Sequence, residues 1–149
     1  ERRAERRCAD EELARYIKNY SLEEFVIIWS NAPIFDTQQS VSQSKRERAK
    51  EIRLSGDPTG YIHSLRNLGR GVLPPIWDQL DQLDFPICLI TGSEDSKHVK
   101  IHRRMQETLP RACSIVVEDV GHNVHFERPD QYVRHLKEFW LGARREDRD

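Results

Sequence analysis

An aspartate and a histidine, Asp95 and His122, are the two side chains of this sequence best placed to do chemistry together. Each follows a short apolar run, residues 86–90 and 113–117 respectively, that is typical of a buried strand. In folds with parallel strands, functional groups gather in the loops after the carboxyl ends of the strands. A carboxylate that orients an imidazole there supplies the acid and the base of a catalytic triad. The two loops therefore predict His122 as a general base and Asp95 as the residue that orients it.

Both residues also have simpler interpretations. Asp95 or Ser93 could cap the helix that follows, and position alone supports that role equally well. A single histidine in a loop is usually structural or solvated. The pairing of two loops, with the acid first and the histidine second along the chain, is what favours chemistry.

A serine nucleophile is missing from this pattern. The turn that carries such a serine has the form G-x-S-x-G, with its glycines four positions apart. Gly56 and Gly60 have this spacing, but they enclose Asp57-Pro58-Thr59. We therefore expect the nucleophile to come from outside this sequence, and the chain to be the back half of an enzyme that is truncated, split or fused into a longer protein.

Metal binding is the competing chemistry for the histidines. His98 and His102 are four positions apart on a predicted helix, and His122 and His125 are three apart. No glutamate follows His98 in the H-E-x-x-H pattern of zinc enzymes, and no cysteines cluster nearby. A solvated helix face explains His98 and His102 better, while His125 is expected to line the pocket of His122 or to support it. We predict no metal site.

Composition narrows the class of protein. Of 149 residues, 37% are apolar and 33% are charged, and the net charge is −1. This balance gives no general attraction to nucleic acids or anionic membranes. No apolar run is long enough to cross a membrane, and the three cysteines show no C-x-x-C pairing. We expect a soluble chain in a reducing compartment, with neither nucleic acid nor a membrane as partner.

The chain divides into a helical part and a part in which strands and helices alternate. Up to residue 80, apolar periodicity predicts four helices, over residues 10–18, 21–29, 44–54 and from 59 to Gly69. Ser21 and Glu24 form a capping box at the start of the second helix. From residue 81, the pattern predicts strand, helix, strand and helix, over residues 86–90, 99–109, 114–117 and 131–140. Strands joined through a helix pair in parallel, and because two parallel strands are not a stable sheet alone, further strands must come from elsewhere.

Several stretches of the chain resemble a known family. Residues 86–105, PICLITGSEDSKHVKIHRRM, and residues 114–140, SIVVEDVGHNVHFERPDQYVRHLKEFW, resemble the last two strands and helices of α/β-hydrolases. Upstream, residues 1–7, 23–35 and 51–80 are similar to the lid and linker of 2-succinyl-6-hydroxy-2,4-cyclohexadiene-1-carboxylate synthases, from menaquinone and phylloquinone biosynthesis. The lid pattern W-x-x-x-P-x-F, followed by I-R-L-S, is what indicates the synthases within the superfamily.

This resemblance implies a fold and a set of site residues. The fold would be a partial α/β-hydrolase fold, of class α/β, with a helical lid and linker over residues 1–80 and the last two parallel strands and their helices over residues 81–149. Asp95 and His122 match the acid and the base of the family's triad. In the lid, Arg6 and Arg53 match arginines that bind substrate carboxylates, and Trp29 matches a tryptophan of the substrate pocket.

The resemblance also implies a reaction, the 2,5-elimination of pyruvate from a cyclohexene dicarboxylate, which needs no metal or organic cofactor. The partners would be this small dicarboxylate substrate and an N-terminal half of the hydrolase fold that supplies the serine. The location would be the cytoplasm, or the plastid for a plant-type fused protein. Two alternatives stay open: a generic α/β-hydrolase, either an esterase or a C–C hydrolase, and a non-catalytic fragment that serves as an interaction module. We expect the chain alone to be weakly stable and inactive.

Overall fold

The computed structural model describes residues 2–146, and their side chains up to residue 143. The chain forms two compact units. The first comprises Glu1–Ala32 and Ser42–Pro75, and the second comprises Pro33–Val41 and Ile76–Asp149. Each unit has its own apolar core, so each is described separately below.

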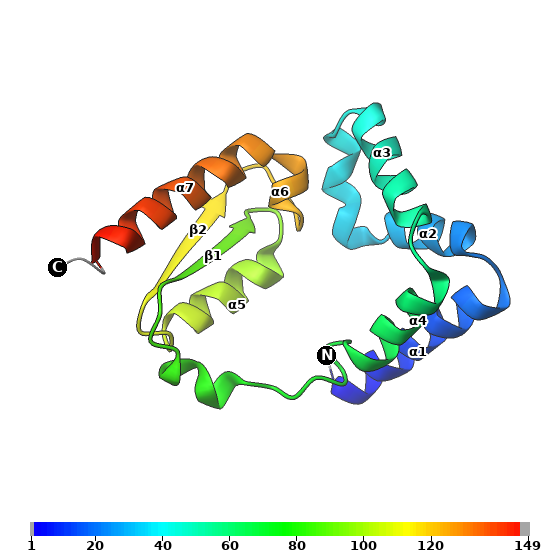
Figure 1. Ribbon diagram of the computed structural model, residues 1–149, viewed down its shortest axis with the longest axis horizontal. Coiled ribbons are helices and arrows are strands. Elements are labelled where there is room, and N and C mark those ends of the chain that lie inside the picture. The colour runs from blue at the N-terminus through cyan, green and yellow to red at the C-terminus, as the bar shows by residue number, and fades with distance from the viewer. Residues whose placement is uncertain (1, 147–149) are drawn as a thin grey trace. The chain divides into compact units, whose positions relative to one another are not determined.

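The regular elements of the first unit, among its described residues, are the helices α1 (Arg3–Asn19), α2 (Leu22–Ser30), α3 (Gln43–Leu54) and α4 (Pro58–Asn67) (Figure 1). These elements confirm the four predicted helices. The predicted cap is formed in part, because Ser21 Oγ accepts the N–H of Glu24 at 3.1 Å. Helix α1 begins well before the predicted start, since its arginines, glutamates and alanines are good helix formers even without an apolar repeat. The apolar faces of this unit meet in a core made of Ile17, Leu22, Phe25 and Val26.

The second unit contains β1 (Ile87–Gly92), α5 (Ser96–Gln106), β2 (Ala112–Val117), α6 (Val124–Glu127) and α7 (Pro129–Glu146). The two strands are parallel, in a register that runs from Ile87 opposite Ala112 to Gly92 opposite Val117. This confirms the predicted strand–helix–strand unit. Figure 1 shows α5 and α7 on opposite sides of the strand pair. Because both strands end at the same edge, the loops that follow them are neighbours.

Apolar packing holds those loops in place but leaves other surface uncovered. A cluster of Val117, Val120 and Val124 lies at the carboxyl end of β2. In contrast, several apolar side chains of α7 are exposed, namely Val133, Leu136, Trp140 and Leu141. A two-stranded sheet with a bare apolar helix face fits the expectation that further strands complete it.

Short helices account for most differences from the predicted elements. Two 3₁₀ segments, η1 (Pro33–Ser40) and η2 (Trp77–Gln82), were not predicted, because pieces this short carry no clear apolar repeat. Helix α2 does end before Pro33, as expected, but that proline then opens η1, where its fixed φ suits a first turn. Residues 33–41 lie inside the predicted lid yet belong to the second unit, and the domain division at residue 80 stays a prediction. No helix among the described residues is both long and apolar enough to span a bilayer.

Candidate active site at the carboxyl end of the strand pair

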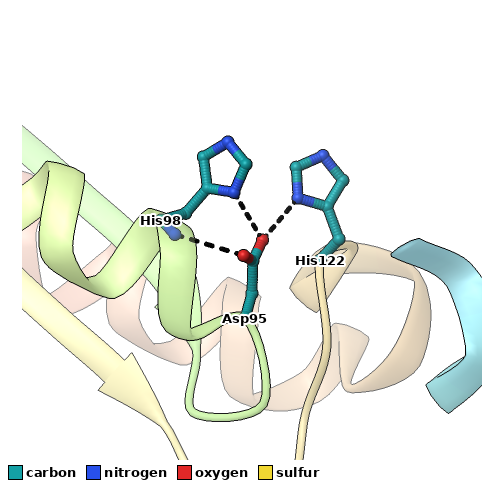
Figure 2. A group of neighbouring side chains, drawn as sticks. All are labelled: Asp95, His98 and His122. Carbon is teal, nitrogen blue, oxygen red and sulfur yellow. Dashed lines mark hydrogen bonds and ion pairs between the residues drawn. The ribbon is translucent and has the colours of Figure 1, made fainter. Parts of the chain in front are cut away.

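Asp95 and His122 meet at the carboxyl ends of β1 and β2. The Nδ1 atom of His122 lies 2.6 Å from Oδ2 of Asp95, a short hydrogen bond (Figure 2). Asp95 is also the N-cap of α5, because its Oδ1 accepts the N–H of His98 at 3.1 Å. The two roles considered for Asp95 are therefore compatible. One oxygen caps the helix, and the other faces the histidine.

Electrostatics define where the protons lie in the pair of Asp95 and His122, which we call the dyad. Burial raises the pKa of Asp95, but the hydrogen bond from His122, the close contact of the His98 ring and the hydrogen bond from the His98 backbone N–H together outweigh burial and hold that pKa below its ordinary value. The carboxylate is therefore ionised at neutral pH and can only accept a hydrogen bond. In neutral His122, Nδ1 must then carry the proton, which leaves the lone pair on Nε2. The side chain of His122 is 33% exposed, so a reacting group can reach this ring.

Close contact between the two loops depends on glycine. A Cβ atom at Gly92 would collide with the backbone of Val120, and one at Gly121 would collide with the side chain of Thr37 in η1. The loops are tied together by backbone hydrogen bonds, from Ser93 N–H to the carbonyl of Val117 and from Glu94 N–H to the carbonyl of Val120, both at 2.9 Å. Gly92 thus lets the two loops approach each other, and Gly121 lets the histidine loop pack against η1.

Glu127 holds the backbone on both sides of His122. Its side chain is buried within α6, and Oε2 accepts the N–H of Gly121 at 3.0 Å while Oε1 accepts the N–H of Asn123 at 3.4 Å. No regular pattern in the sequence identifies Glu127 as part of the site. The available signal was a glutamate shortly after the histidine loop, directly before Arg128 and Pro129.

A second histidine reaches the same carboxylate. His98 Nδ1 lies 2.7 Å from Asp95 Oδ2, and the rings of His98 and His122 are 4.7 Å apart between centroids (Figure 2). The predicted solvated helix face is therefore wrong, since His98 and His102 are both half-buried. Burial first, and then the charge of His98, lower the pKa of His102, while Asp95 opposes this shift. His125 is exposed, and its ring packs edge-on against Tyr132.

Two of the three predicted substrate-binding residues line one cavity in the first unit. This cavity has a volume of about 310 Å³ and is lined by Phe25, Val26, Trp29, Arg53, Tyr61, Ser64 and Leu65. Arg53 is held there from two sides, because its Nη1 lies 3.3 Å from Ser30 Oγ and its carbonyl accepts the Tyr61 hydroxyl at 2.9 Å. The result is a largely apolar pocket with one guanidinium, which suits a partly apolar anion.

Arg6 is placed elsewhere in the same unit. Its guanidinium forms an ion pair with Asp10, a buried carboxylate one helical turn along α1. Arg6 is not among the described residues that line the cavity of Trp29 and Arg53. A substrate-binding role for Arg6 stays a prediction, and binding there would compete with Asp10.

The fold and the dyad together define a class of protein. A thermophilic esterase from Thermogutta terrifontis matches 93% of this chain with a TM-score of 0.76, at 17% identity and over 51% of the esterase chain, which shows the shared fold. The chain has the C-terminal part of an α/β-hydrolase fold, as predicted. No family model matches the chain.

Within that class, the chain resembles one kind of enzyme. MenH from S. aureus matches 95% of this chain and 53% of its own, with a TM-score of 0.93 and 26% identity. A putative 2-succinyl-6-hydroxy-2,4-cyclohexadiene-1-carboxylate synthase from Bacillus subtilis (strain 168) is 34% identical over 137 residues, which cover 92% of this chain and 50% of the relative. The protein PHYLLO, chloroplastic, of Arabidopsis thaliana is 26% identical over 142 residues, which cover 90% of this chain and 8% of that protein. The predicted resemblance to these synthases is confirmed, and the chain spans about half the length of the bacterial synthases it matches.

Proposed function

We propose that this chain supplies the acid, the base and a substrate-binding lid of a 2-succinyl-6-hydroxy-2,4-cyclohexadiene-1-carboxylate synthase. The reaction is the elimination of pyruvate from a cyclohexene dicarboxylate, a carbon–oxygen lyase step. The observation that carries the proposal is the 2.6 Å contact between His122 and Asp95 in a chain 34% identical to a synthase of this name. A serine from the half of the fold that the chain does not match completes the triad.

In the proposed mechanism, His122 makes that serine a base. Nε2 of His122 takes the hydroxyl proton, and the serine oxygen removes a proton from the substrate ring. The electron pair of the broken C–H bond enters the double-bond system of the ring as the C–O bond to the leaving three-carbon unit breaks. The departing enolate takes up the proton held on Nε2 of His122, which releases pyruvate and returns the imidazole to its neutral form. Asp95 stabilises the imidazolium that forms. Positioned proton transfer of this kind typically accelerates a reaction by about 10²–10⁴-fold.

Arg53 and Trp29 are proposed to bind the substrate. A guanidinium recognises a carboxylate through paired, charge-assisted hydrogen bonds, and it also stabilises negative charge that develops as the proton leaves. The apolar wall around Arg53, with Phe25 and Trp29, supports a role in binding a carboxylate that is attached to a hydrocarbon ring. Arg6 is proposed as a second carboxylate ligand, provided that substrate displaces Asp10.

A chimera tests the proposal directly. The N-terminal half of the Bacillus subtilis relative, the part that this chain does not cover, is joined to the start of this chain. The chimera is assayed for pyruvate release from the cyclohexene dicarboxylate substrate of the synthases and for hydrolysis of p-nitrophenyl esters. We expect pyruvate release that depends on His122, and no activity from the chain alone.

The outcomes separate the candidate functions. A folded chimera that hydrolyses esters without releasing pyruvate would identify a generic esterase, which shares the dyad but has no need of Arg53. A folded chimera that lacks both activities would favour a non-catalytic role for the chain. A chimera carrying His122→Ala serves as the matched negative control.

A further inference from the structure

Three potential metal ligands surround one carboxylate oxygen. One carboxylate oxygen of Asp95 and one ring nitrogen each of His98 and His122 all lie within 4.8 Å of one another. They come from two places in the fold, since Asp95 caps α5 and His98 lies in the first turn of the same helix, while His122 lies in the loop after β2. Figure 2 shows both imidazoles directing Nδ1 at the same carboxylate. We refer to these three residues as the Asp95–His98–His122 triplet.

The triplet has more ligand atoms than the proposed reaction uses. His122 forms a hydrogen bond with Asp95 Oδ2. His98 Nδ1 lies 2.7 Å from the same oxygen but is not aligned for a hydrogen bond, and it is a buried nitrogen without a hydrogen-bond partner. A buried polar atom left in this way is costly unless something binds it. A cation that all three residues can bind would satisfy this nitrogen.

We propose that the Asp95–His98–His122 triplet is a binding site for a divalent transition-metal ion, with Zn²⁺ as the best-suited cation. Two imidazole nitrogens and one carboxylate oxygen are the ligand set of zinc sites that keep a fourth position for water. Ca²⁺ and Mg²⁺ prefer oxygen ligands throughout and fit this set poorly. The partial exposure of His122 leaves a path for that water. The ligand contacts of 2.6 and 2.7 Å must lengthen by roughly 0.6–1 Å, because two atoms that share a tetrahedral zinc at about 2.0–2.2 Å lie about 3.3–3.6 Å apart.

A bound metal would prevent His122 from acting as the proposed base, a consequence that rests on the proposed function. A metal on Nδ1 of His122 displaces the proton from that nitrogen. The neutral ring must then carry its remaining proton on Nε2, where the mechanism requires a lone pair. Metal binding and catalysis by His122 are therefore mutually exclusive, and zinc would act as a reversible inhibitor.

Binding is tested on the full chain, without any assay of activity. ZnCl₂ is titrated by calorimetry into a chain in which the exposed thiols of Cys8 and Cys113 are replaced by serine, because thiolates also bind zinc. We expect saturable binding of one ion per chain. His98→Gln is expected to weaken binding by about tenfold or more, as losses around metal sites do. His102→Gln, on the same helix but outside the triplet, is the matched control and should leave affinity within about twofold.

Nitrogen-15 spectra of the histidine rings locate the site without any substitution at the triplet. Zinc should move the Nδ1 signals of His98 and His122 together. The proposal is overturned by the absence of saturable binding in the sub-millimolar range, by equal affinity in His98→Gln, or by an equal loss in His102→Gln. The last result would indicate a helix-face site at His98 and His102.

Inhibition is measured separately on the chimera. Zinc should lower the rate of pyruvate release, a chelator should restore it, and His98→Gln should need about tenfold more zinc for the same fractional loss of its own rate. If the chimera releases no pyruvate, the proposed function fails while the binding result stands. If the chimera is active but insensitive to zinc, inhibition through the triplet fails and the proposed function stands.

Discussion

Replacing Glu127 with alanine is expected to loosen the loop that carries His122 before it disturbs the strands beneath. Glu127 is 6% exposed, and its carboxylate receives the backbone N–H groups of Gly121 and Asn123, one on each side of the histidine. With alanine, both amides lose their acceptor. Gly121 is buried, so water cannot readily take the place of the carboxylate. The backbone of His122 would then be free to move.

The lengths of the two hydrogen bonds to Glu127 determine how large the expected free-energy change is. A hydrogen bond to a charged acceptor contributes about 1.5–3 kcal/mol, and the bond of 3.0 Å to Gly121 counts in full, whereas the longer one of 3.4 Å to Asn123 is weaker. Removal of the buried carboxylate also removes its desolvation cost, which offsets part of the loss. We therefore expect Glu127→Ala to lower the free energy of loop opening by about 2 kcal/mol, which raises the opening equilibrium about thirtyfold. Glu127→Gln keeps one acceptor oxygen and should show about half of this free-energy change.

Amide hydrogen exchange, followed by NMR, measures this opening residue by residue. The amides of Gly121 and Asn123 should exchange about thirtyfold faster in Glu127→Ala, with little change in β1. Glu138→Gln is the matched control, because Glu138 is an exposed glutamate whose contact with His135 spans 3.4 Å, and its effect should stay within about 0.5 kcal/mol. Unchanged exchange at Gly121 and Asn123 would refute the role assigned to Glu127. Equal acceleration throughout β1 would show a global rather than a local effect.

Three further predictions concern the base, the lid and the thiols. In the chimera, His122→Ala should lower kcat by about 10²–10⁴-fold with little change in KM, and a variant with unaltered turnover would exclude His122 as the base. Arg53→Gln should raise KM by about 10–150-fold, the equivalent of one lost charge-assisted contact. Arg48→Gln, on the exposed face of the same helix, is the control and should leave KM unchanged. Equal KM values in both variants would contradict carboxylate binding by Arg53. Burial and the neighbouring thiol of Cys113 raise the pKa of Cys88 to about 12, so that its reactive thiolate is absent until the pH approaches that value. Iodoacetamide at pH 8 should therefore modify exposed Cys8 first, as peptide mass mapping would show, and equal labelling of Cys88 in the folded chain would be inconsistent with its burial.

The long elements and the dyad were predictable because each depends on a regular pattern. Helices α1 and α2 bury one face each, through residues such as Ile17 and Phe25, and this produces an apolar repeat in the sequence. The meeting of Asp95 and His122 follows from topology. Parallel strands joined by a helix end at one edge, so residues in the two following loops must be close.

The neighbours of the dyad were not predictable, because they depend on where helices begin. The sequence places His98 on a helix face, but its apolar repeat starts only at residue 99 and does not define the first turn. The actual α5 begins at Ser96 with Asp95 as its cap, so His98 takes the third helical position, whose N–H turns back to the capping carboxylate. The role of Glu127 was not predictable for a related reason. It ends α6, a single turn of four residues, and a segment this short has no periodicity that separates a buried face from an exposed one.

The described contacts that orient His122 all come from the second unit. Asp95 holds the ring, Glu127 holds the backbone, and Gly92 allows the two loops to touch. The proposed serine contributes nothing to this arrangement. The proposed base is therefore oriented by contacts within this chain, and the tautomer with its proton on Nδ1 should already dominate in the chain alone. Joining the other half of the fold would then place a serine beside a histidine whose orientation and tautomer are already fixed. The rate of a chimera therefore depends on how accurately that serine is placed.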